Sequence, residues 1–184
     1  MLSGRSLDAG ESALPVLGAL AVVALPGRTA SAHPHLWIDV TANVLFDKDR
    51  VSAIRFQWTF DEFFSAGVIG EFDKNTNKKF DDNEIEPLRT GAFEGTKELG
   101  FFTDLRIGET KMRVENTTDF VPRIEKEIVI YEFTVPLPEP IDPTQTSLVF
   151  SLYDESYFVD IGFVGHDPIA RVTVKLVSQS GIGA

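Results

Sequence analysis

The sequence contains no cysteine and only three histidines among its 184 residues. Without cysteine, disulfides, thiolate zinc sites and iron–sulfur clusters are excluded, and any imidazole metal site must use His33, His35 or His166. Basic residues are also scarce, because 17 Lys and Arg stand against 28 Asp and Glu, which gives a net charge of −11. This charge disfavours nucleic acid and anionic lipid as partners and attracts cations.

A hydrophobic run long enough to span a bilayer is also missing. The apolar run over residues 13–26 is too short for a transmembrane helix and has the length of a signal-peptide core. Arg5 precedes this run, and Ala30-Ser31-Ala32 after it fits a small-x-small cleavage site. We therefore predict a signal peptide over residues 1–32 and a periplasmic mature chain without a transmembrane segment. The alternative is a retained, buried N-terminal segment.

Alternating apolar and polar residues indicate strands along most of the remaining chain. Residues 35–46 and 50–59 flank a short polar turn and are typical of a β-hairpin. Further strand patterns cover residues 101–107, 110–115, 124–135, 147–153, 157–164 and 169–177. Four prolines in one connection predict a loop there: Pro136, Pro138, Pro140 and Pro143. The pattern predicts a mainly β, sandwich-like fold in a single domain over residues 33–184.

The hydrophobic period changes from two to about four in the middle of the chain. Phe60, Phe64, Val68 and Phe72 recur every four residues, as on one face of a helix. A second helix is indicated by four further apolar residues, with Pro87 in its first turn: Ile85, Leu88, Ala92 and Leu99. We expect a helix–loop–helix insertion over residues 60–99, between the second and third strands.

The polar loop inside this insertion resembles an EF-hand calcium loop. Oxygen-bearing side chains occupy the ligand positions 1, 3, 5, 9 and 12, and position 7 would supply its backbone carbonyl. In order of position these residues are Asp73, Asn75, Asn77, Lys79, Asp81 and Glu84. Lys78 replaces the glycine that is usual at position 6, where the turn is strained. The spacing predicts a weak, structural Ca²⁺ site, with a solvated Asn/Asp-rich turn as the alternative.

A second candidate metal site lies at the predicted mature terminus. Cleavage before His33 exposes an α-amine that can chelate a metal together with the imidazoles of His33 and His35. Pro34 has no amide N–H, so a square-planar site that uses a deprotonated amide is excluded. Candidates for a further ligand are His166 and several carboxylates: Asp39, Asp61, Glu62, Asp154 and Asp160. These ligands suit nickel, cobalt, zinc or copper, and the alternative is a solvated terminus whose histidines bind nothing.

Several segments together resemble a known family. The start His33-Pro34-His35, the segment Trp58–Ser65, the loop 73–84 and the segment Leu152–Val159 are similar to an uncharacterised bacterial periplasmic family, domain of unknown function 1007. The resemblance covers essentially the whole predicted mature chain. It implies metal handling, because members resemble periplasmic components of metal transport systems and are often encoded beside metal permeases.

These observations favour a periplasmic metal-binding protein that serves a divalent transition-metal transport system through a membrane permease. The main alternative is a calcium-stabilised extracytoplasmic binding domain without a transition-metal role. An enzyme with a copper site at its N-terminal histidine is a third hypothesis. However, the sequence has no Gly-x-Ser-x-Gly elbow, no phosphate-binding glycine loop and no paired acid and base. We therefore expect a protein with no catalytic residues.

Overall fold

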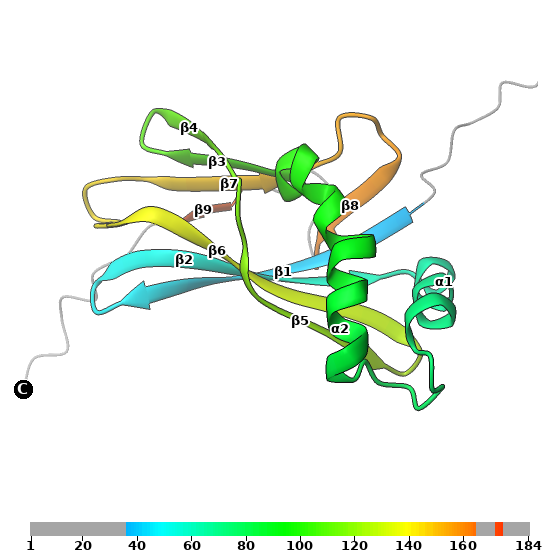
Figure 1. Cartoon of the computed structure of the whole chain (residues 1–184). Coiled ribbons are helices and arrows are strands. Elements are labelled where there is room, and N and C mark those ends of the chain that lie inside the picture. Colours follow the sequence, from blue (N-terminus) through cyan, green and yellow to red (C-terminus); the bar gives the residue numbers. More distant parts are fainter. Residues whose placement is uncertain (1–35, 165–171, 175–184) are drawn as a thin grey trace, which may run out of the picture. The chain divides into compact units, whose positions relative to one another are not determined.

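The computed structural model describes residues 36–164 and 172–174, which form two β-sheets joined by a helical segment (Figure 1). The first sheet has the strand order β5-β6-β2-β1-β8, and the second has the order β4-β3-β7-β9. The strands of the first sheet are β1 (Leu36–Asp47), β2 (Arg50–Phe60), β5 (Thr118–Glu125), β6 (Ile128–Ile141) and β8 (Val159–Phe163). Those of the second are β3 (Thr103–Ile107), β4 (Thr110–Arg113), β7 (Leu148–Leu152) and β9 (Val172–Val174).

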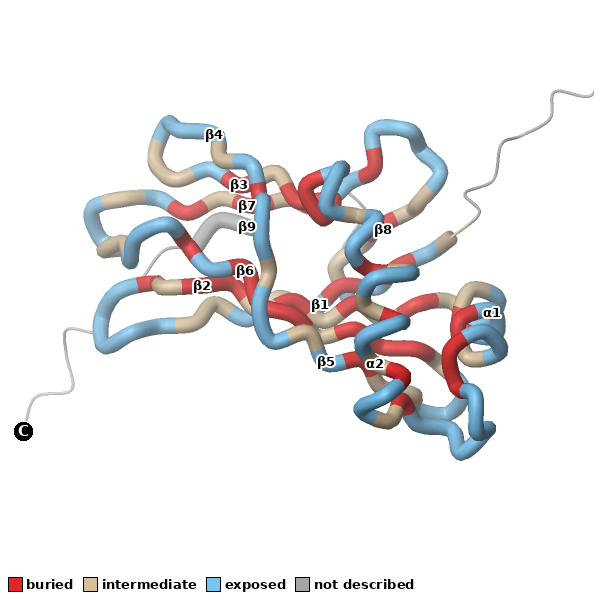
Figure 2. Tube along the Cα trace, viewed as in Figure 1, coloured by how far each residue is buried: buried red, intermediate tan, exposed pale blue. Residues whose placement is uncertain are grey.

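The two sheets share one aromatic core. Phe56 of β2 meets Phe150 of β7 edge to face, with ring centroids 5.6 Å apart. The ring centroid of Trp58, also on β2, lies 4.8 Å from that of Phe133 on β6. It lies 5.8 Å from the ring centroid of Phe102, which directly precedes β3. Figure 2 marks buried stretches in red along β2, β6 and β7. The prediction of a mainly β protein with two packed sheets is confirmed.

The predicted helical insertion lies between β2 and β3. It consists of α1 (Glu62–Phe72), α2 (Asp82–Leu88), the π-helical turn η1 (Arg89–Phe93) and the 3₁₀ segment η2 (Glu94–Phe102). Asp61 caps α1, because its carboxylate accepts the Phe64 N–H at 2.8 Å. The buried hydroxyl of Ser65 accepts the Val129 N–H at 2.9 Å and thereby fixes α1 on β6.

Two strand predictions are wrong in detail. Residues 124–135 do not form one strand, because Lys126 and Glu127 take positive φ values of 51° and 68° and make the β5–β6 turn. Such turns usually carry Asn or Gly, so Lys-Glu leaves no signal in the sequence. Three of the four clustered prolines do not lie in a loop either, since β6 continues through Pro136, Pro138 and Pro140 to Ile141. Pro143 does lie in the connection to β7, as predicted.

The alternate spacing of these prolines explains why the strand survives. Pro136, Pro138 and Pro140 are two residues apart, so their missing N–H groups all fall on one side of β6. Pairing with β5 extends only to Thr134, whereas Pro136 still pairs with Ala53 of β2. Because β5 does not pair with β6 beyond Thr134, the prolines remove no hydrogen bond between these two strands.

The second predicted helix differs from the observed one. α2 begins at Asp82 rather than near Ile85, because Asp81 is its N-cap and Glu84 accepts the Asp81 N–H at 3.0 Å. Pro87 consequently lies inside α2 and not in its first turn. After Leu88 the regular helix gives way to the π and 3₁₀ turns. No helix within the described ranges has the length and apolar character needed to cross a membrane.

Candidate functional site

The loop 73–84 is closed by two buried carboxylates, one at each end. Asp73 is 5% exposed and Glu84 is 3% exposed. The Glu84 carboxylate accepts the Lys74 N–H at 2.8 Å through Oε1 and the Asp81 N–H at 3.0 Å through Oε2. One side chain therefore joins the second residue of the loop to the start of α2.

The other end of the loop is organised around Asp73. Its carboxylate accepts the Asn77 N–H at 3.1 Å and the Lys78 N–H at 2.9 Å. Lys78 has a φ of 62°, in the left-handed region that glycine usually occupies. Position 6 of the predicted calcium loop thus has the backbone that such a loop requires, at a cost of about 1 kcal/mol for a side chain other than glycine.

The two asparagines complete the network. Both side-chain amides donate to Oδ2 of Asp81, Asn75 at 2.7 Å and Asn77 at 2.9 Å. The Asn77 side-chain amide oxygen, Oδ1, accepts the Lys79 N–H at 2.9 Å. Hydrogen bonds between side chains, and from backbone N–H groups to side chains, therefore join the predicted loop residues to one another.

This arrangement supplies oxygen atoms of the kind that calcium prefers. Asp73, Asp81 and Glu84 carry negative charge, and each asparagine amide can turn its oxygen toward a cation by rotating about its last bond. Across residues 36–164 and 172–174, however, no three His, Cys, Asp or Glu side chains are grouped closely enough to hold a metal ion. Calcium binding therefore requires the loop side chains to exchange hydrogen bonds among themselves for bonds to the cation.

The loop is also tied to the first sheet. Lys78 Nζ lies 2.7 Å from Oε1 of Glu127 in the β5–β6 turn, and both side chains are exposed. The hydrogen bond and the opposite charge raise the pKa of Lys78 and lower the pKa of Glu127. Because both side chains are exposed, the ion pair contributes little to the stability of the fold. It does show that the loop lies beside the β5–β6 turn.

The histidines of the second candidate site, His33, His35 and His166, lie outside the described residues, and so does the predicted signal peptide. Two carboxylates proposed as further ligands are engaged elsewhere. Asp61 accepts the Trp37 N–H at 2.9 Å in addition to capping α1. Asp154 is 8% exposed, and its carboxylate accepts hydrogen bonds within its own turn. The remaining candidates Asp39, Glu62 and Asp160 are exposed or half-buried.

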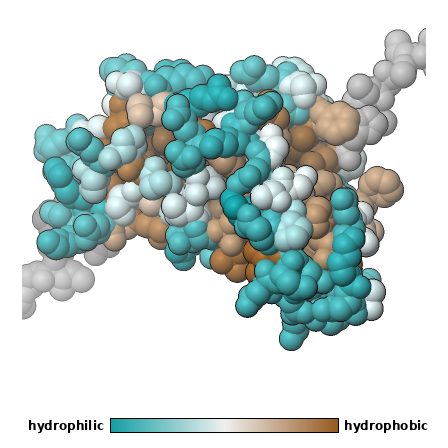
Figure 3. All heavy atoms as spheres, viewed as in Figure 1, coloured by the Kyte–Doolittle hydropathy of each residue, from teal (hydrophilic) through white to brown (hydrophobic). Residues whose placement is uncertain are grey.

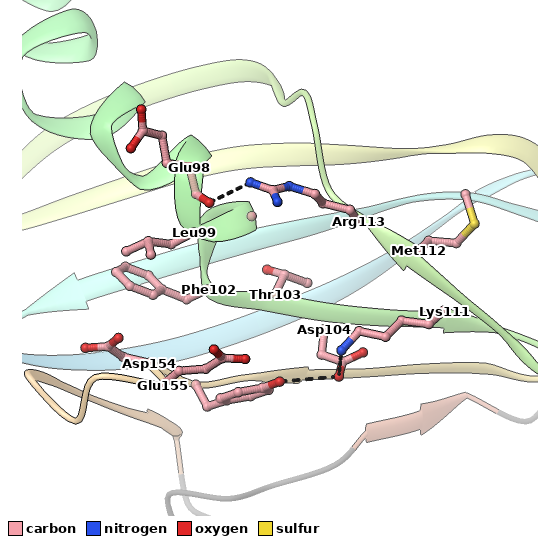
Figure 4. Close-up of a pocket in the computed structure, with 12 residues that line it drawn as sticks. Glu98, Leu99, Phe102, Thr103, Asp104, Lys111, Met112, Arg113, Asp154 and Glu155 are labelled. Carbon is pink, nitrogen blue, oxygen red and sulfur yellow. Dashed lines mark hydrogen bonds and ion pairs between the residues drawn. The ribbon is translucent and has the colours of Figure 1, made fainter.

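A mixed-charge pocket of about 310 Å³ lies between η2, the β3–β4 hairpin and the end of β7 (Figure 4). The Asp104 carboxylate accepts hydrogen bonds from Lys111 Nζ at 2.9 Å and from the Tyr153 hydroxyl at 3.5 Å. Arg113 donates to the backbone carbonyl of Glu98 at 2.6 Å. Sequence reasoning missed this pocket, because its residues come from separate elements and have no common spacing.

An apolar groove runs beside α1, and we call it the α1 groove. It has a volume of about 660 Å³ and is lined by Leu36, Phe63, Phe64, Gly67, Val68, Glu71, Phe72, Gly91, Ala92 and Phe158. Phe63 is 86% exposed at its edge. Figure 3 shows apolar side chains reaching the surface in the region of α1. The recurrence of apolar residues every four positions predicted the buried face of α1 but did not predict this groove.

The fold and the loop define a two-sheet β protein with a helical insertion that carries an acidic loop. The chain belongs to the family described as "Protein of unknown function (DUF1007)", whose model matches residues 18–178.

An uncharacterised 15.5 kDa protein in the trpE 3′ region of Spirochaeta aurantia is 37% identical over 103 residues, 56% of this chain and 73% of that protein. An uncharacterised protein of Haemophilus influenzae (strain ATCC 51907 / DSM 11121 / KW20 / Rd) is 22% identical over 140 residues, 75% of this chain and 66% of that protein. No solved structure matches the chain.

Proposed function

We propose that the protein is an extracytoplasmic metal-binding protein whose loop 73–84 binds Ca²⁺ and clips α1 to α2. The observation that carries the proposal is the pair of buried carboxylates, Asp73 and Glu84, at the two ends of a loop of calcium-binding spacing. The left-handed backbone at Lys78 supports it. Calcium would neutralise the negative charge of Asp73, Asp81 and Glu84 and would stabilise the folded chain by mass action.

The role of this calcium is structural rather than sensory. Sensor EF-hands open two helices and expose a methionine-rich groove when calcium binds. α2 has only seven residues, and Ser65 anchors α1 to β6 through the Val129 N–H. Met112, the one methionine after Met1, lies on β4 in the other sheet. These features favour a fixed clip with an affinity of about 0.1–1 mM, as in extracellular modules.

Thermal unfolding in calcium tests the clip. We expect millimolar CaCl₂ to raise the Tm of the protein, and the Glu84→Gln substitution to abolish most of this rise because it removes a ligand charge. Glu109→Gln is the matched control, since Glu109 is an exposed acid outside the loop. MgCl₂ at the same ionic strength controls for screening. An unchanged wild-type Tm in calcium would refute the clip.

A second metal role is favoured by His33-Pro34-His35, which directly precedes β1. The α-amine of His33 and the two imidazoles would bind Ni²⁺, Co²⁺, Zn²⁺ or Cu²⁺, with His166 as a further ligand. Such a site suits an accessory protein of a periplasmic metal transport system that exchanges its ion with a membrane permease. The family and the excess of acidic residues are compatible with this role.

Titration of the terminus separates this role from an incidental pair of histidines. Isothermal titration should show binding that weakens below about pH 6.5, where imidazole is protonated, and that still rises toward about pH 8 as the α-amine loses its proton. One extra residue before His33 should weaken binding, although both imidazoles remain. If the extended and natural termini bind equally well, the amine is not a ligand. If neither binds, the calcium-stabilised domain without a transition-metal role is the better description.

A further inference from the structure

Two polar side chains lie inside the aromatic core without a hydrogen-bond partner among the described residues. Trp58 of β2 and Tyr131 of β6 are each 1% exposed. Neither the indole N–H of Trp58 nor the hydroxyl of Tyr131 makes a hydrogen bond to any residue that the structure describes. Buried polar groups in folded proteins nearly always have a partner, because an unpaired group loses its bonds to water and gains none in return.

The two side chains are neighbours on the inner face of the first sheet. Trp58 pairs directly with Tyr131 in the β2–β6 register, and such opposite residues have Cβ atoms about 5 Å apart on the same face. Both rings also contact the same two phenylalanines. The ring centroid of Phe60 lies 6.3 Å from that of Trp58 and 4.7 Å from that of Tyr131. The ring centroid of Phe93 lies 6.0 Å from each of them. The indole and the phenol therefore belong to one cluster.

The rings around this pair offer no strong hydrogen-bond acceptor. Within the described part of the chain, the rings in contact with the pair are Phe60, Phe93, Phe102, Phe120 and Phe133. An indole N–H can only donate a hydrogen bond, whereas a phenol hydroxyl can donate one and accept another. Burial raises the pKa of Tyr131, so its hydroxyl keeps its proton. The missing partner must therefore be an acceptor that the phenylalanines do not supply.

We propose that Trp58 and Tyr131 form a buried binding site for a water molecule, which accepts the Trp58 N–H and shares a hydrogen bond with the Tyr131 hydroxyl. Buried waters typically make about two to four hydrogen bonds to groups that are otherwise unsatisfied. The occupant is small, because both side chains are almost completely buried and line neither the mixed-charge pocket nor the α1 groove. Water meets both requirements, since it is small and accepts hydrogen bonds.

The water site lies where the helical insertion packs on the first sheet. Phe93 belongs to the π-helical turn η1, and its ring contacts both Trp58 and Tyr131. A water held by the pair consequently joins β2 to β6 beneath η1, and its loss should weaken the fold. The inference goes beyond the proposed function and does not depend on it, because neither residue belongs to loop 73–84 or to the terminal histidines.

A high-resolution crystal structure of the purified protein tests the site directly. The proposal expects electron density for one water whose oxygen lies within about 3.2 Å of both Trp58 Nε1 and Tyr131 Oη. The proposal is overturned if the density shows no water at this position. A direct hydrogen bond from the Trp58 N–H to the Tyr131 hydroxyl, or an N–H directed at the face of the Phe60 ring, would be the alternative ways to satisfy the indole.

Thermal unfolding of Tyr131→Phe tests the site in solution, because the sign of the effect separates a bound hydroxyl from an unpaired one. A hydroxyl that bonds a buried water stabilises the fold, so its removal should lower the Tm. A hydroxyl without a partner destabilises the fold, so its removal should raise the Tm. Tyr157→Phe is the matched control, since Tyr157 is 87% exposed and its Tm should not change. Circular dichroism confirms that both variants fold. A Tm of Tyr131→Phe that is unchanged or raised overturns the proposal.

Discussion

Loop 73–84 begins where α1 ends, and the α1 groove runs along the same helix, yet the two sites are built differently. The loop takes all its polar groups from twelve consecutive residues, and nearly all of its hydrogen bonds stay within the loop. The groove combines residues of β1, α1, η1 and the β7–β8 connection. Local spacing therefore defines the loop, whereas packing of distant segments defines the groove.

The sites also differ in what holds them. The loop depends on charge and on backbone N–H groups that point at carboxylates, so its stability should respond to cations and to substitution of single acids. The groove depends on apolar burial beneath α1, so its shape should respond to the size of core side chains. Four predictions use this difference, from the largest expected effect to the smallest.

The residue that joins the two sites is Phe72, which lines the groove and precedes Asp73. It is 9% exposed, and its ring lies against Gly91. Phe72→Ala should lower the free energy of unfolding by about 3 kcal/mol through the lost burial and the cavity that remains. Urea unfolding followed by circular dichroism measures this change. Phe63→Ala, at an 86% exposed position, should change it by no more than about 0.5 kcal/mol. If both variants lowered the free energy of unfolding by the same amount, the groove would not depend on buried packing.

Asp154 supports the distant wall of the groove. Its carboxylate accepts hydrogen bonds from the Ser156 hydroxyl at 2.7 Å and from the N–H groups of Phe158 at 3.0 Å and Val159 at 2.9 Å. Asp154→Ala should lower the free energy of unfolding by about 2 kcal/mol, because part-buried N–H groups lose a charged acceptor. The variant should leave the rise of the Tm in calcium unchanged, because Asp154 lies outside the loop 73–84. A reduced calcium response in this variant would show that the two sites are coupled.

The same carboxyl predicts a dependence of stability on pH. Burial acts to raise the pKa of Asp154, but the hydrogen bonds from Ser156, Val159 and Phe158 outweigh burial and leave the pKa below the ordinary value of 3.8. Because the folded pKa is depressed, the stabilisation is fully present above pH 3.8 and is lost as the pH falls through the folded value. The difference in stability between wild type and Asp154→Ala should therefore shrink in acid, which unfolding series between pH 5 and pH 2 would measure.

The smallest expected change concerns the backbone of the loop. Lys78 has a positive φ, so Lys78→Gly removes strain of about 1 kcal/mol. Lys78→Ala is the control, because it loses the Glu127 ion pair equally but keeps the strain. The glycine variant should be about 1 kcal/mol more stable than the alanine variant and should bind calcium more tightly. Equal stability of the two variants would contradict a strained, left-handed backbone at position 78.

Sequence patterns located most elements but not all of their ends. The four-residue spacing of Phe64, Val68 and Phe72 correctly predicted α1, but Phe60, which the same spacing placed on the helix, is the last residue of β2. The alternation in residues 35–46 and 50–59 correctly predicted β1 and β2. The turn at Lys126 and Glu127 was missed, because its left-handed backbone is imposed by the pairing of β5 with β6 and not by residues that prefer it. The strand through Pro136 was missed for a related reason: a proline is tolerated where no neighbouring strand needs its N–H.

The sequence by itself determined the two-sheet class, the helical insertion and the grouping of acids in loop 73–84, because hydrophobic period and ligand spacing are local properties of the chain. It also supplied the prediction of the His33 and His35 site, which stays a prediction. Only the tertiary structure decided that Asp61 accepts the Trp37 N–H, and that Phe158 and Gly67 line the same groove. These pairings join residues far apart in the chain, and strand register and helix packing set them rather than any spacing that a sequence displays.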